Sequence, residues 1–257
     1  MAKIKVGLIP ACGKGNRISE LPLTKVLPKP MLPVLDKPII HHVVERMNQM
    51  GIEMIYITAF HLKETIQKYF GDGSEFGVEI KFIIPDEYPP GLGDSVYLAN
   101  EYIKEPFVTI LGDDFTLSSS PEIFPNTFFD KKALVVEGVV KDTSIDSLKR
   151  TCCVHLSKDG KIFDIVEKPE RPKWKMRGCG IYVFDPIIFE YIKTQEVDPE
   201  KGKKDLTKAI QTIARKTKRV YGVPVDVNIN INTLSDLHQA TLFLLAEQEK
   251  FLKANKR

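Results

Sequence analysis

The stretch Ala11-Cys12-Gly13-Lys14-Gly15-Asn16-Arg17 directly follows an apolar run, Ile4 to Pro10, which predicts a strand buried on both faces. Its two glycines allow backbone N–H groups to approach an anion closely, and Lys14 and Arg17 can neutralise that anion. The pattern favours a loop that binds a polyphosphate at the carboxyl end of a strand. A plain glycine turn is the alternative that the loop alone leaves open.

Two common phosphate-binding motifs do not fit this loop. The segment from Gly7 to Gly15 nearly forms G-x-x-x-x-G-K-[ST], but its spacing is one residue too long. Gly15 also stands where that motif needs a hydroxyl for magnesium. The dinucleotide pattern G-x-G-x-x-G fails because Ile18 occupies the place of the third glycine.

A second basic segment follows, Leu23-Thr24-Lys25-Val26-Leu27-Pro28-Lys29-Pro30-Met31-Leu32-Pro33-Val34. The prolines at positions 28, 30 and 33 argue against a helix and predict a stiff, extended chain around Lys29. A lysine held on a rigid loop is well placed to be fixed against a phosphate. This segment therefore strengthens the case for a phosphate site.

Beyond these loops, apolar patterns alternate between strand and helix. Strands are predicted at Met54 to Thr58, Val78 to Ile84 and Phe107 to Leu111, and helices at Ile39 to Met50, His61 to Phe70 and Ser95 to Ile103. Such alternation predicts an α/β fold with a mainly parallel, Rossmann-like sheet flanked by helices. Ligands bind beyond the carboxyl ends of such strands, where Gly112-Asp113-Asp114 also lies.

After about residue 115 the predicted strands become shorter, and Asp159-Gly160 forms a hairpin-type turn between two of them. This half is expected to be mixed and partly antiparallel, and to end in a long amphipathic helix from Leu234 to Leu252. We find no repeat and no low-complexity linker. The expectation is a single domain, 1–257, with a nucleotide-binding half, 1–115, and a substrate half, 116–257.

Composition narrows the class of protein further. The chain has 257 residues, of which 43% are hydrophobic and 28% charged, a balance that excludes a disordered chain. The net charge of +3 does not imply a nucleic-acid partner. None of the four cysteines has C-x-x-C spacing, which favours a reducing cytoplasm. No signal peptide and no membrane-spanning stretch is expected.

Taken together, the two loops resemble the signature of the sugar-1-phosphate nucleotidyltransferases, G-G-x-G-[ST]-R followed by P-K-P and a proline-containing apolar tail. Within that family the chain looks most like the glucose-1-phosphate uridylyl- and thymidylyltransferases. Further motifs of the family match in order along the chain: Gly91-Leu92-Gly93, Leu111-Gly112-Asp113-Asp114, Val166-Glu167-Lys168-Pro169, Gly180-Ile181-Tyr182-Val183-Phe184-Asp185-Pro186 and Asn230-Ile231-Asn232-Thr233.

The resemblance implies a reaction in which a sugar-1-phosphate oxygen attacks the α-phosphorus of a nucleoside triphosphate and pyrophosphate leaves. On the matching positions Arg17 would hold the triphosphate, Lys29 the α-phosphate and Lys168 the sugar phosphate. The nucleotide would also contact Ala11, Gly13, Lys14, Gly15, Asp86 and Gly91. Reactions of this kind depend on positioning and charge neutralisation more than on a protein nucleophile.

The resemblance also implies a magnesium ion as cofactor. Asp113 would carry it, since Mg²⁺ takes oxygen ligands together with substrate phosphates. For the second ligand the family usually has an aspartate, and here the matching residue is Asn230. Asp226 is the nearest carboxylate and the reserve candidate. Asp114 is expected to point to the other side of the strand.

Several positions depart from the family pattern. Glu167 would accept hydrogen bonds from sugar hydroxyls and Gly180 would let the backbone pack on the sugar ring, but Cys152 stands where relatives often have glycine. Uridylyl- and thymidylyltransferases also place a glutamine five residues before the Gly-Leu-[Gly/Ala] turn, where this chain has Asp86. UTP or dTTP and glucose-1-phosphate remain the favoured substrates.

Two other classes stay open. One is a non-catalytic homologue that binds a nucleotide or nucleotide sugar as a regulator, which the departures at Asn16, Cys152 and Asn230 would fit. The other is a nucleotide-sugar-dependent glycosyltransferase, which the adjacent Asp113-Asp114 and the P-K-P loop disfavour. Relatives in the resembled family form dimers and tetramers, so a homo-oligomer is expected.

Overall fold

A computed structural model of the chain describes residues 3–15, 18, 21–197 and 202–254, with side chains as far as residue 250. Its centre is a run of parallel strands, in which β1 (Val6–Ala11) lies between β4 (Met54–Ala59) and β6 (Phe107–Ile110). The strand β5 (Glu79–Ile83) pairs with the outer edge of β4. The strand and helix alternation predicted for the first half is confirmed.

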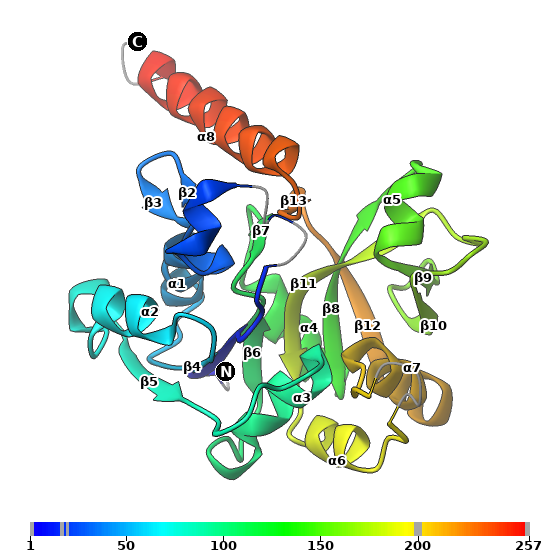
Figure 1. Cartoon of the computed structure of the whole chain (residues 1–257). Coiled ribbons are helices and arrows are strands. Elements are labelled where there is room, and N and C mark those ends of the chain that lie inside the picture. The colour runs from blue at the N-terminus through cyan, green and yellow to red at the C-terminus, as the bar shows by residue number, and fades with distance from the viewer. Residues whose placement is uncertain (1–2, 16–17, 19–20, 198–201, 255–257) are drawn as a thin grey trace.

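The second half extends the same sheet with mixed strand directions (Figure 1). The strand β11 (Met176–Phe184) pairs antiparallel with β6 and with β8 (Val135–Lys141), and β12 (Val220–Pro224) runs parallel to β8. A hairpin of β9 (Cys152–Leu156) and β10 (Ile162–Glu167) completes it. Both halves therefore contribute to one nine-stranded sheet.

Helices cover both faces of this sheet. On one face the apolar side chains of α1 (Ile39–Gln49), α2 (Lys63–Phe70) and α4 (Ile123–Asp130) pack into one core cluster. On the other face α3 (Leu92–Tyr97), α6 (Ile187–Lys193) and α7 (Leu206–Thr217) pack into a second. The predicted α/β fold, a sheet flanked by helices, is therefore confirmed.

Two helices lie outside these layers. The short helix α5 (Ile145–Arg150) precedes β9, and the long helix α8 (Leu234–Ala254) extends away from the body (Figure 1). A third core cluster, which includes Leu32, Phe115, Ile231 and Leu237, joins the base of α8 to the loops around β2 (Pro33–Val34) and β3 (Lys37–Pro38). Within the described part of the chain, no helix has the length and apolar character needed to cross a membrane.

A small second sheet was not predicted. It pairs β7 (Asp114–Leu117) antiparallel with β13 (Val227–Asn230). Each of its strands alternates polar and apolar residues, as Asp114-Phe115-Thr116-Leu117 and Val227-Asn228-Ile229-Asn230, but with four residues each they lie at the lower limit of length for recognising a strand from its pattern. This sheet carries much of the candidate site.

The expectation of an extended chain around Lys29 was wrong. Lys29–Met31 forms a single 3-10 turn, and Pro22–Lys25 forms another. Proline is compatible with the first positions of a turn because its missing N–H is not needed there. Pro28 is itself extended, with φ −66° and ψ 151°, so the prolines fix where the turn begins.

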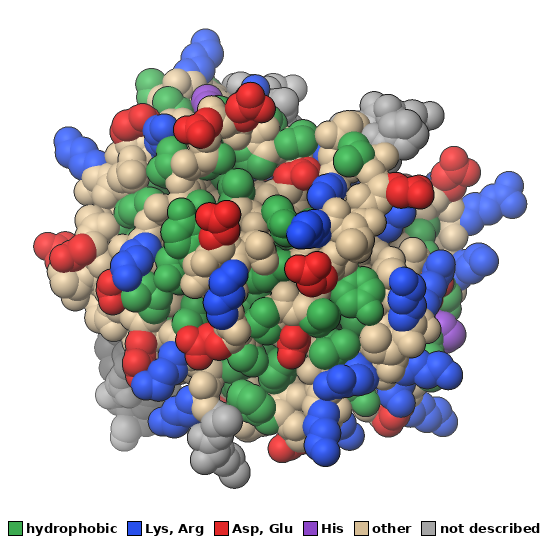
Figure 2. All heavy atoms as spheres, turned by 90° about the horizontal axis from the view of Figure 1, so that it is seen from below, with side chains coloured by type: hydrophobic (Ala, Val, Ile, Leu, Met, Phe, Trp, Pro, Cys, Tyr) green, Lys and Arg blue, Asp and Glu red, His purple; other side chains and the backbone are tan. Residues whose placement is uncertain are grey.

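Charged side chains of both signs are interspersed on the surface. Figure 2 shows lysines and arginines alternating with carboxylates on the face seen from below, with apolar patches between them. Toward the lower right of that view Lys and Arg side chains predominate over carboxylates.

A fully buried acid lies in the middle of the sheet. Glu137 stands on β8 opposite Tyr182 of β11 and Gly222 of β12. The Cys152 thiol donates to its Oε1 across 3.9 Å, and its Oε2 has no hydrogen-bond partner in the described structure. Burial raises the pKa of Glu137 to about 8, and the charge of Glu167 adds to the rise. The carboxyl is therefore protonated at neutral pH.

This acid predicts a specific loss of stability at high pH. The unfolded chain releases the Glu137 proton near pH 4.5, whereas the folded chain keeps it to about pH 8. The contribution of this group to the free energy of unfolding is therefore full below pH 4.5 and falls as pH rises to about 8, by a few kcal/mol in order of magnitude. Glu137→Gln should remove this slope.

The measurement is the thermal midpoint of wild type and Glu137→Gln between pH 5 and 8.5. We expect the thermal midpoint of Glu137→Gln to increase relative to that of the wild type as pH rises. Glu79→Gln, at an exposed position on β5, is the matched control and should track the wild type. Parallel curves for wild type and Glu137→Gln would show that Glu137 does not hold its proton in the folded protein.

Candidate active site

The candidate site is organised around an ion pair between Lys29 and Asp113. Lys29 Nζ lies 2.6 Å from Asp113 Oδ2, although 84 residues separate the two in sequence. The lysine side chain is only 6% exposed, and the aspartate is 33% exposed. The turn at Lys29–Met31 thus brings its cation to the carboxyl end of β6, where Asp113 follows the strand. The structure joins these two sequence-predicted residues.

Lys29 has a second partner, Asn232, that the sequence analysis did not single out. The ammonium donates to Asn232 Oδ1 at 3.1 Å, and Asn232 Nδ2 donates to Asn230 Oδ1. A lysine ammonium has three donors, so one has no partner among the described residues. A signal was present in the sequence, because Asn232 belongs to the same Asn230-Ile231-Asn232-Thr233 motif, although it lies beyond the end of β13.

The segment that carries Asn232 is itself held in place. Asp236 Oδ2 accepts hydrogen bonds from the backbone N–H groups of Asn232, at 2.9 Å, and Thr233, at 2.8 Å. Thr233 Oγ1 in turn accepts from the Asp236 N–H at 3.2 Å. This reciprocal pattern is a capping box at the start of α8. The long helix therefore anchors one wall of the site.

The oxygen donors at this edge suit a hard divalent cation. The Asp113 carboxylate and the amide oxygen of Asn230 lie at the ends of facing strands, since Asn230 pairs with Asp114 in the register of β13 and β7. Carboxylate and amide oxygens, completed by phosphates and water, are the ligands that Mg²⁺ prefers. The described residues contain no group of three or more His, Cys, Asp or Glu side chains that could hold a metal by themselves.

The reserve candidate, Asp226, lies elsewhere. Its Oδ2 accepts from the Ser119 backbone N–H at 2.6 Å, and it precedes Asn230 by four residues, roughly 13 Å along a strand. It is thus at the far end of β13 from Asp113. The geometry favours Asn230 over Asp226 as the partner of Asp113.

Asp114 points away from Asp113 into the protein, as expected from the alternation of side chains along a strand. Its carboxylate accepts hydrogen bonds from the Gly180 N–H at 2.7 Å, the Thr116 hydroxyl at 3.1 Å and the Asn228 amide. Burial raises the pKa of Asp114 to about 6, and the neighbouring charge of Asp113 adds to the rise. Asp114 is therefore part of the support of the site.

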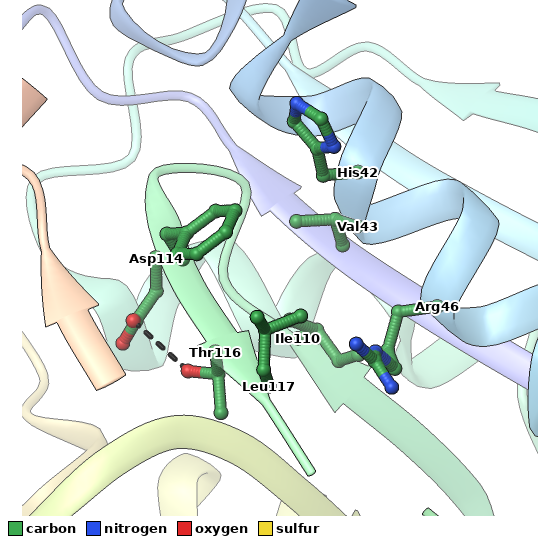
Figure 3. A pocket seen from close by; sticks show the side chains of 8 residues that line it. His42, Val43, Arg46, Ile110, Asp114, Thr116 and Leu117 are labelled. Atoms are coloured by element: carbon green, nitrogen blue, oxygen red, sulfur yellow. Dashed lines mark hydrogen bonds between the residues drawn. The ribbon is translucent and has the colours of Figure 1, made fainter. Parts of the chain in front are cut away.

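A small pocket lies beside this carboxylate, between α1 and β7 (Figure 3). His42, Val43 and Arg46 reach it from α1, while the Asp114 carboxylate turns toward Thr116. Arg46 donates to the Ser118 carbonyl at 3.0 Å. The side chains that line this pocket fix β7 against α1, and the pocket does not include Asp113 or Lys29.

Gly180 has a structural reason to be glycine. A Cβ at this position would collide with the Asp114 carboxylate, and its backbone N–H already donates to that carboxylate. The sequence analysis placed Gly180 against the sugar ring. The structure gives it a contact with Asp114 that the motif alone did not indicate.

The glycine-rich loop begins at Ala11, the last residue of β1, and passes close to Lys29. A Cβ at Gly13 would meet open space, whereas Gly15 has φ +68° and a Cβ there would lie 3.0 Å from the Lys29 Cβ. Gly15 thus gives the loop a left-handed conformation beside the buried lysine. Arg17, the predicted ligand of the triphosphate, lies outside the described residues.

Lys14 contacts an aromatic ring. Its Nζ lies 4.6 Å from the centroid of the Tyr88 ring, which also packs edge-on against Phe60. Tyr88 belongs to the loop after β5 that also carries Asp86, whose side chain is exposed. The predicted nucleotide-binding residues Lys14 and Asp86 therefore lie on neighbouring loops at the carboxyl ends of β1 and β5.

Gly91 permits a close approach of the backbone. A Cβ at this position would collide with the carbonyl of Lys204, and the Gly93 N–H donates to that same carbonyl at 3.2 Å. Asp94 accepts from the Lys204 N–H at 2.9 Å. The predicted glycine turn is thus packed against the start of α7, a contact for which the sequence gives no signal.

The predicted sugar-phosphate residues lie at the end of β10. Glu167 pairs in register with Cys152 of β9, and its carboxylate accepts from the Thr207 hydroxyl at 3.1 Å. Lys168 follows with φ +45° and an exposed ammonium 3.6 Å from Glu167 Oε1. Its backbone N–H donates to the Thr151 carbonyl at 2.8 Å. Glu167, Lys168, Thr151 and Cys152 thus form one local cluster.

Comparison with known proteins identifies the family of the chain. The model of the family described as Nucleotidyl transferase matches residues 6–247. A UTP–glucose-1-phosphate uridylyltransferase of Staphylococcus epidermidis is 30% identical over 255 residues, which cover 89% of this chain and 87% of the relative. Another from Staphylococcus saprophyticus is 32% identical over 242 residues, or 84% and 83% of the two chains.

Solved structures show the same fold. A putative glucose-1-phosphate thymidylyltransferase from Bacillus anthracis superposes with a TM-score of 0.82 at 25% identity, covering 93% of this chain and 94% of the other. A UDP-glucose pyrophosphorylase solved with UDP-glucose has a TM-score of 0.82 at 23% identity, with 95% and 99% covered. Because the family model spans nearly the whole chain, this protein belongs to the Nucleotidyl transferase family.

Proposed function

We propose that this enzyme transfers a nucleotidyl group from UTP or dTTP to glucose-1-phosphate, giving a nucleotide sugar and pyrophosphate, with Mg²⁺ as cofactor. The observation that carries the proposal is the buried Lys29 ammonium beside Asp113. The pair lies at the edge of the sheet where the glycine-rich loop also begins, after Ala11 of β1. The names of the relatives described above support the choice of nucleotide and sugar.

In the proposed reaction a phosphate oxygen of glucose-1-phosphate forms a bond to the α-phosphorus of the triphosphate. The bond from that phosphorus to the pyrophosphate oxygen breaks, and pyrophosphate leaves with its electron pair. Lys29 would stabilise the negative charge that gathers on the α-phosphate oxygens, since a preformed cation in a dry site acts strongly there. Arg17 would hold the triphosphate.

The other residues of the proposed site would bind and orient the cation and the two substrates. Asp113 and Asn230 would hold the cation, which when bound neutralises phosphate charge. Ala11, Gly13, Lys14, Gly15 and Gly91 would line the nucleotide. Lys168 would pair with the phosphate of the sugar, Glu167 with its hydroxyls, and the backbone at Gly180 would lie near its ring. Glu167 is exposed and has one hydrogen-bonded oxygen, so it can accept further donors.

The proposal also includes the cellular location and the oligomeric state of the protein. All four cysteines are free and buried, which fits a reducing compartment, and we place the protein in the cytoplasm. A homodimer or homotetramer fits the exposed Leu242 and Leu245 on the projecting α8. Light scattering coupled to gel filtration measures the assembly directly.

One assay tests the proposed function. The purified protein is incubated with Mg²⁺, one nucleoside triphosphate and one sugar-1-phosphate, and the pyrophosphate and nucleotide sugar that form are measured. The nucleotides are UTP, dTTP, CTP and GTP, and the sugar phosphates are glucose-, galactose-, mannose- and N-acetylglucosamine-1-phosphate. We expect UTP or dTTP with glucose-1-phosphate to give the highest kcat/KM, and excess chelator to abolish turnover. Nucleotide binding without pyrophosphate from any pair would favour the non-catalytic homologue, and sugar transfer from a nucleotide sugar would favour the glycosyltransferase.

Lys29→Ala should lower kcat by about 100-fold, because it removes the cation that faces the α-phosphate in the transition state. Its effect on stability should be small, since the Asp113 carboxylate left behind is 33% exposed and can be hydrated. Steady-state kinetics and thermal unfolding measure the two effects. Lys25→Ala, at an exposed position of the same segment, is the control and should keep full activity.

Asp86→Gln tests recognition of the base. An ionised aspartate accepts hydrogen bonds but cannot donate to a pyrimidine carbonyl, whereas an amide does both. The variant should raise the preference for UTP or dTTP over CTP and GTP by about tenfold, the worth of one modest hydrogen-bond change. Glu87→Gln, on the next residue, is the control. Unchanged ratios of kcat/KM across the four nucleotides would show that residue 86 does not read the base.

A further inference from the structure

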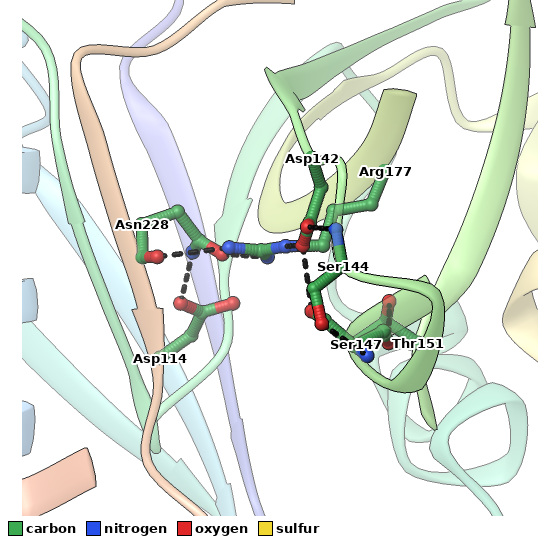
Figure 4. Close-up of polar contacts among 7 residues, drawn as sticks. All are labelled: Asp114, Asp142, Ser144, Ser147, Thr151, Arg177 and Asn228. Atoms are coloured by element: carbon green, nitrogen blue, oxygen red, sulfur yellow. Dashed lines mark hydrogen bonds and ion pairs between the residues drawn. The ribbon is translucent and has the colours of Figure 1, made fainter. Parts of the chain in front are cut away.

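Arg177 connects two parts of the molecule that the proposed function keeps separate. It lies near the start of β11, between Val140 of β8 and Cys153 of β9, and its side chain is only 11% exposed. No motif of the sequence singled it out. Its guanidinium reaches to both sides at once (Figure 4).

On one side Arg177 binds β13. Its Nη2 donates to the Asn228 carbonyl at 2.9 Å, and its Nη1 donates to Asn228 Oδ1. The amide of Asn228 then donates to Asp114 and, at 2.7 Å, to the Thr116 hydroxyl. Asn228 thus ties β13 to β7 by its side chain in addition to the strand pairing.

This side of the network fixes the spacing of the proposed metal ligands. Asp113 immediately precedes β7, and Asn230 ends β13, two residues after Asn228. A shift of β13 along or away from β7 would change the separation of the two oxygen donors. The contacts of Arg177 and Asn228 resist such a shift. Mg²⁺ is sensitive to it, because it demands near-ideal octahedral geometry.

On the other side Arg177 binds Asp142. Its Nε donates to Asp142 Oδ2 at 3.1 Å. The same carboxylate accepts from the Ser144 N–H at 2.8 Å and the Ser147 hydroxyl at 2.6 Å, which are at the start of α5. Burial raises the pKa of Asp142, but the bonds from Ser147 and Ser144 and the charge of Arg177 outweigh it, so that the pKa is lower than usual.

The far end of α5 leads to the proposed sugar-phosphate residues. Thr151 donates from its hydroxyl to the Ser147 carbonyl at 2.9 Å, and its own carbonyl accepts from the Lys168 N–H at 2.8 Å. The next residue, Cys152, is the register partner of Glu167. A continuous chain of hydrogen bonds therefore runs from Asp114, beside the metal ligand, through Arg177 and Asp142 to Lys168.

We propose that Arg177 is a positioning residue that holds the metal-binding edge and the sugar-phosphate segment in one fixed relation. The proposal rests on the proposed function, because it assigns the two ends of the network to metal and sugar phosphate. A planar guanidinium with donors on both edges can bridge Asn228 and Asp142 simultaneously, and a lysine ammonium cannot match that fork. Arg177 contacts neither substrate.

The test separates the two sides of the network, one from Arg177 through Asn228 to β13 and the other from Arg177 through Asp142 to α5. Arg177→Met should raise both the half-saturating Mg²⁺ concentration and the KM for glucose-1-phosphate, by about tenfold each. Asp142→Ala releases α5 alone and should raise only the KM for glucose-1-phosphate. Asn228→Ala releases β13 alone and should raise only the requirement for Mg²⁺. Arg215→Met, which breaks the exposed pair with Asp164, is the matched control and should leave both values unchanged.

Binding of Mn²⁺ to the protein with UTP, followed by electron paramagnetic resonance, gives a readout independent of turnover. It should weaken in Arg177→Met and Asn228→Ala but not in Asp142→Ala. If Arg177→Met does not fold, Arg177→Lys is used instead, because it keeps the positive charge and the aliphatic part of the side chain. It should likewise raise the half-saturating Mg²⁺ concentration and the KM for glucose-1-phosphate. Equal effects of Asp142→Ala and Asn228→Ala on both quantities, or unchanged values in the Arg177 variant, would overturn the proposal. Absence of pyrophosphate release by the wild type would instead refute the proposed function.

Discussion

The contact between Lys29 and Asp113 is the constraint on which the rest of the site depends. A lysine ammonium that is 6% exposed is stable only when its donors are hydrogen-bonded, and here Asp113 and Asn232 supply the acceptors. To bring them together the chain uses a proline-bounded turn, the end of a buried parallel strand and the capped start of α8. The candidate site is thus assembled from distant segments.

Behind this contact lies a layer of buried polar groups that connects three strands. Asp114 accepts from Gly180, Thr116 and Asn228, and each of these donors belongs to a strand that the carboxylate helps to align. Buried polar groups of this kind destabilise the fold when they lack hydrogen-bond partners, and they make the structure around them rigid when all of them are paired. Glycine at position 180 is the sterically required partner, because any side chain would displace the carboxylate.

Much of this could be predicted from the sequence, for identifiable reasons. The parallel strands are continuous apolar runs, and α1 has an apolar stripe ended by Gly51, so local pattern and tertiary structure agree. Asp113 and Lys29 could be predicted because each belongs to a motif of the family that the sequence resembles. The pair β7 and β13 could not be predicted, because their stability comes from hydrogen bonds among Asp114, Asn228 and Arg177 across the fold. The turn at Lys29 was misjudged because proline also favours the start of a turn.

We propose that the Lys29 ammonium, which pairs with Asp113, contacts the α-phosphate when Mg²⁺ and nucleotide bind. A crystal structure with Mg²⁺ and UTP tests it most directly. We expect the separation of Lys29 Nζ and Asp113 Oδ2 to increase from 2.6 Å as Asp113 ligates the cation and Lys29 contacts an α-phosphate oxygen. A bound nucleotide with the ion pair intact and the metal away from Asp113 would contradict it.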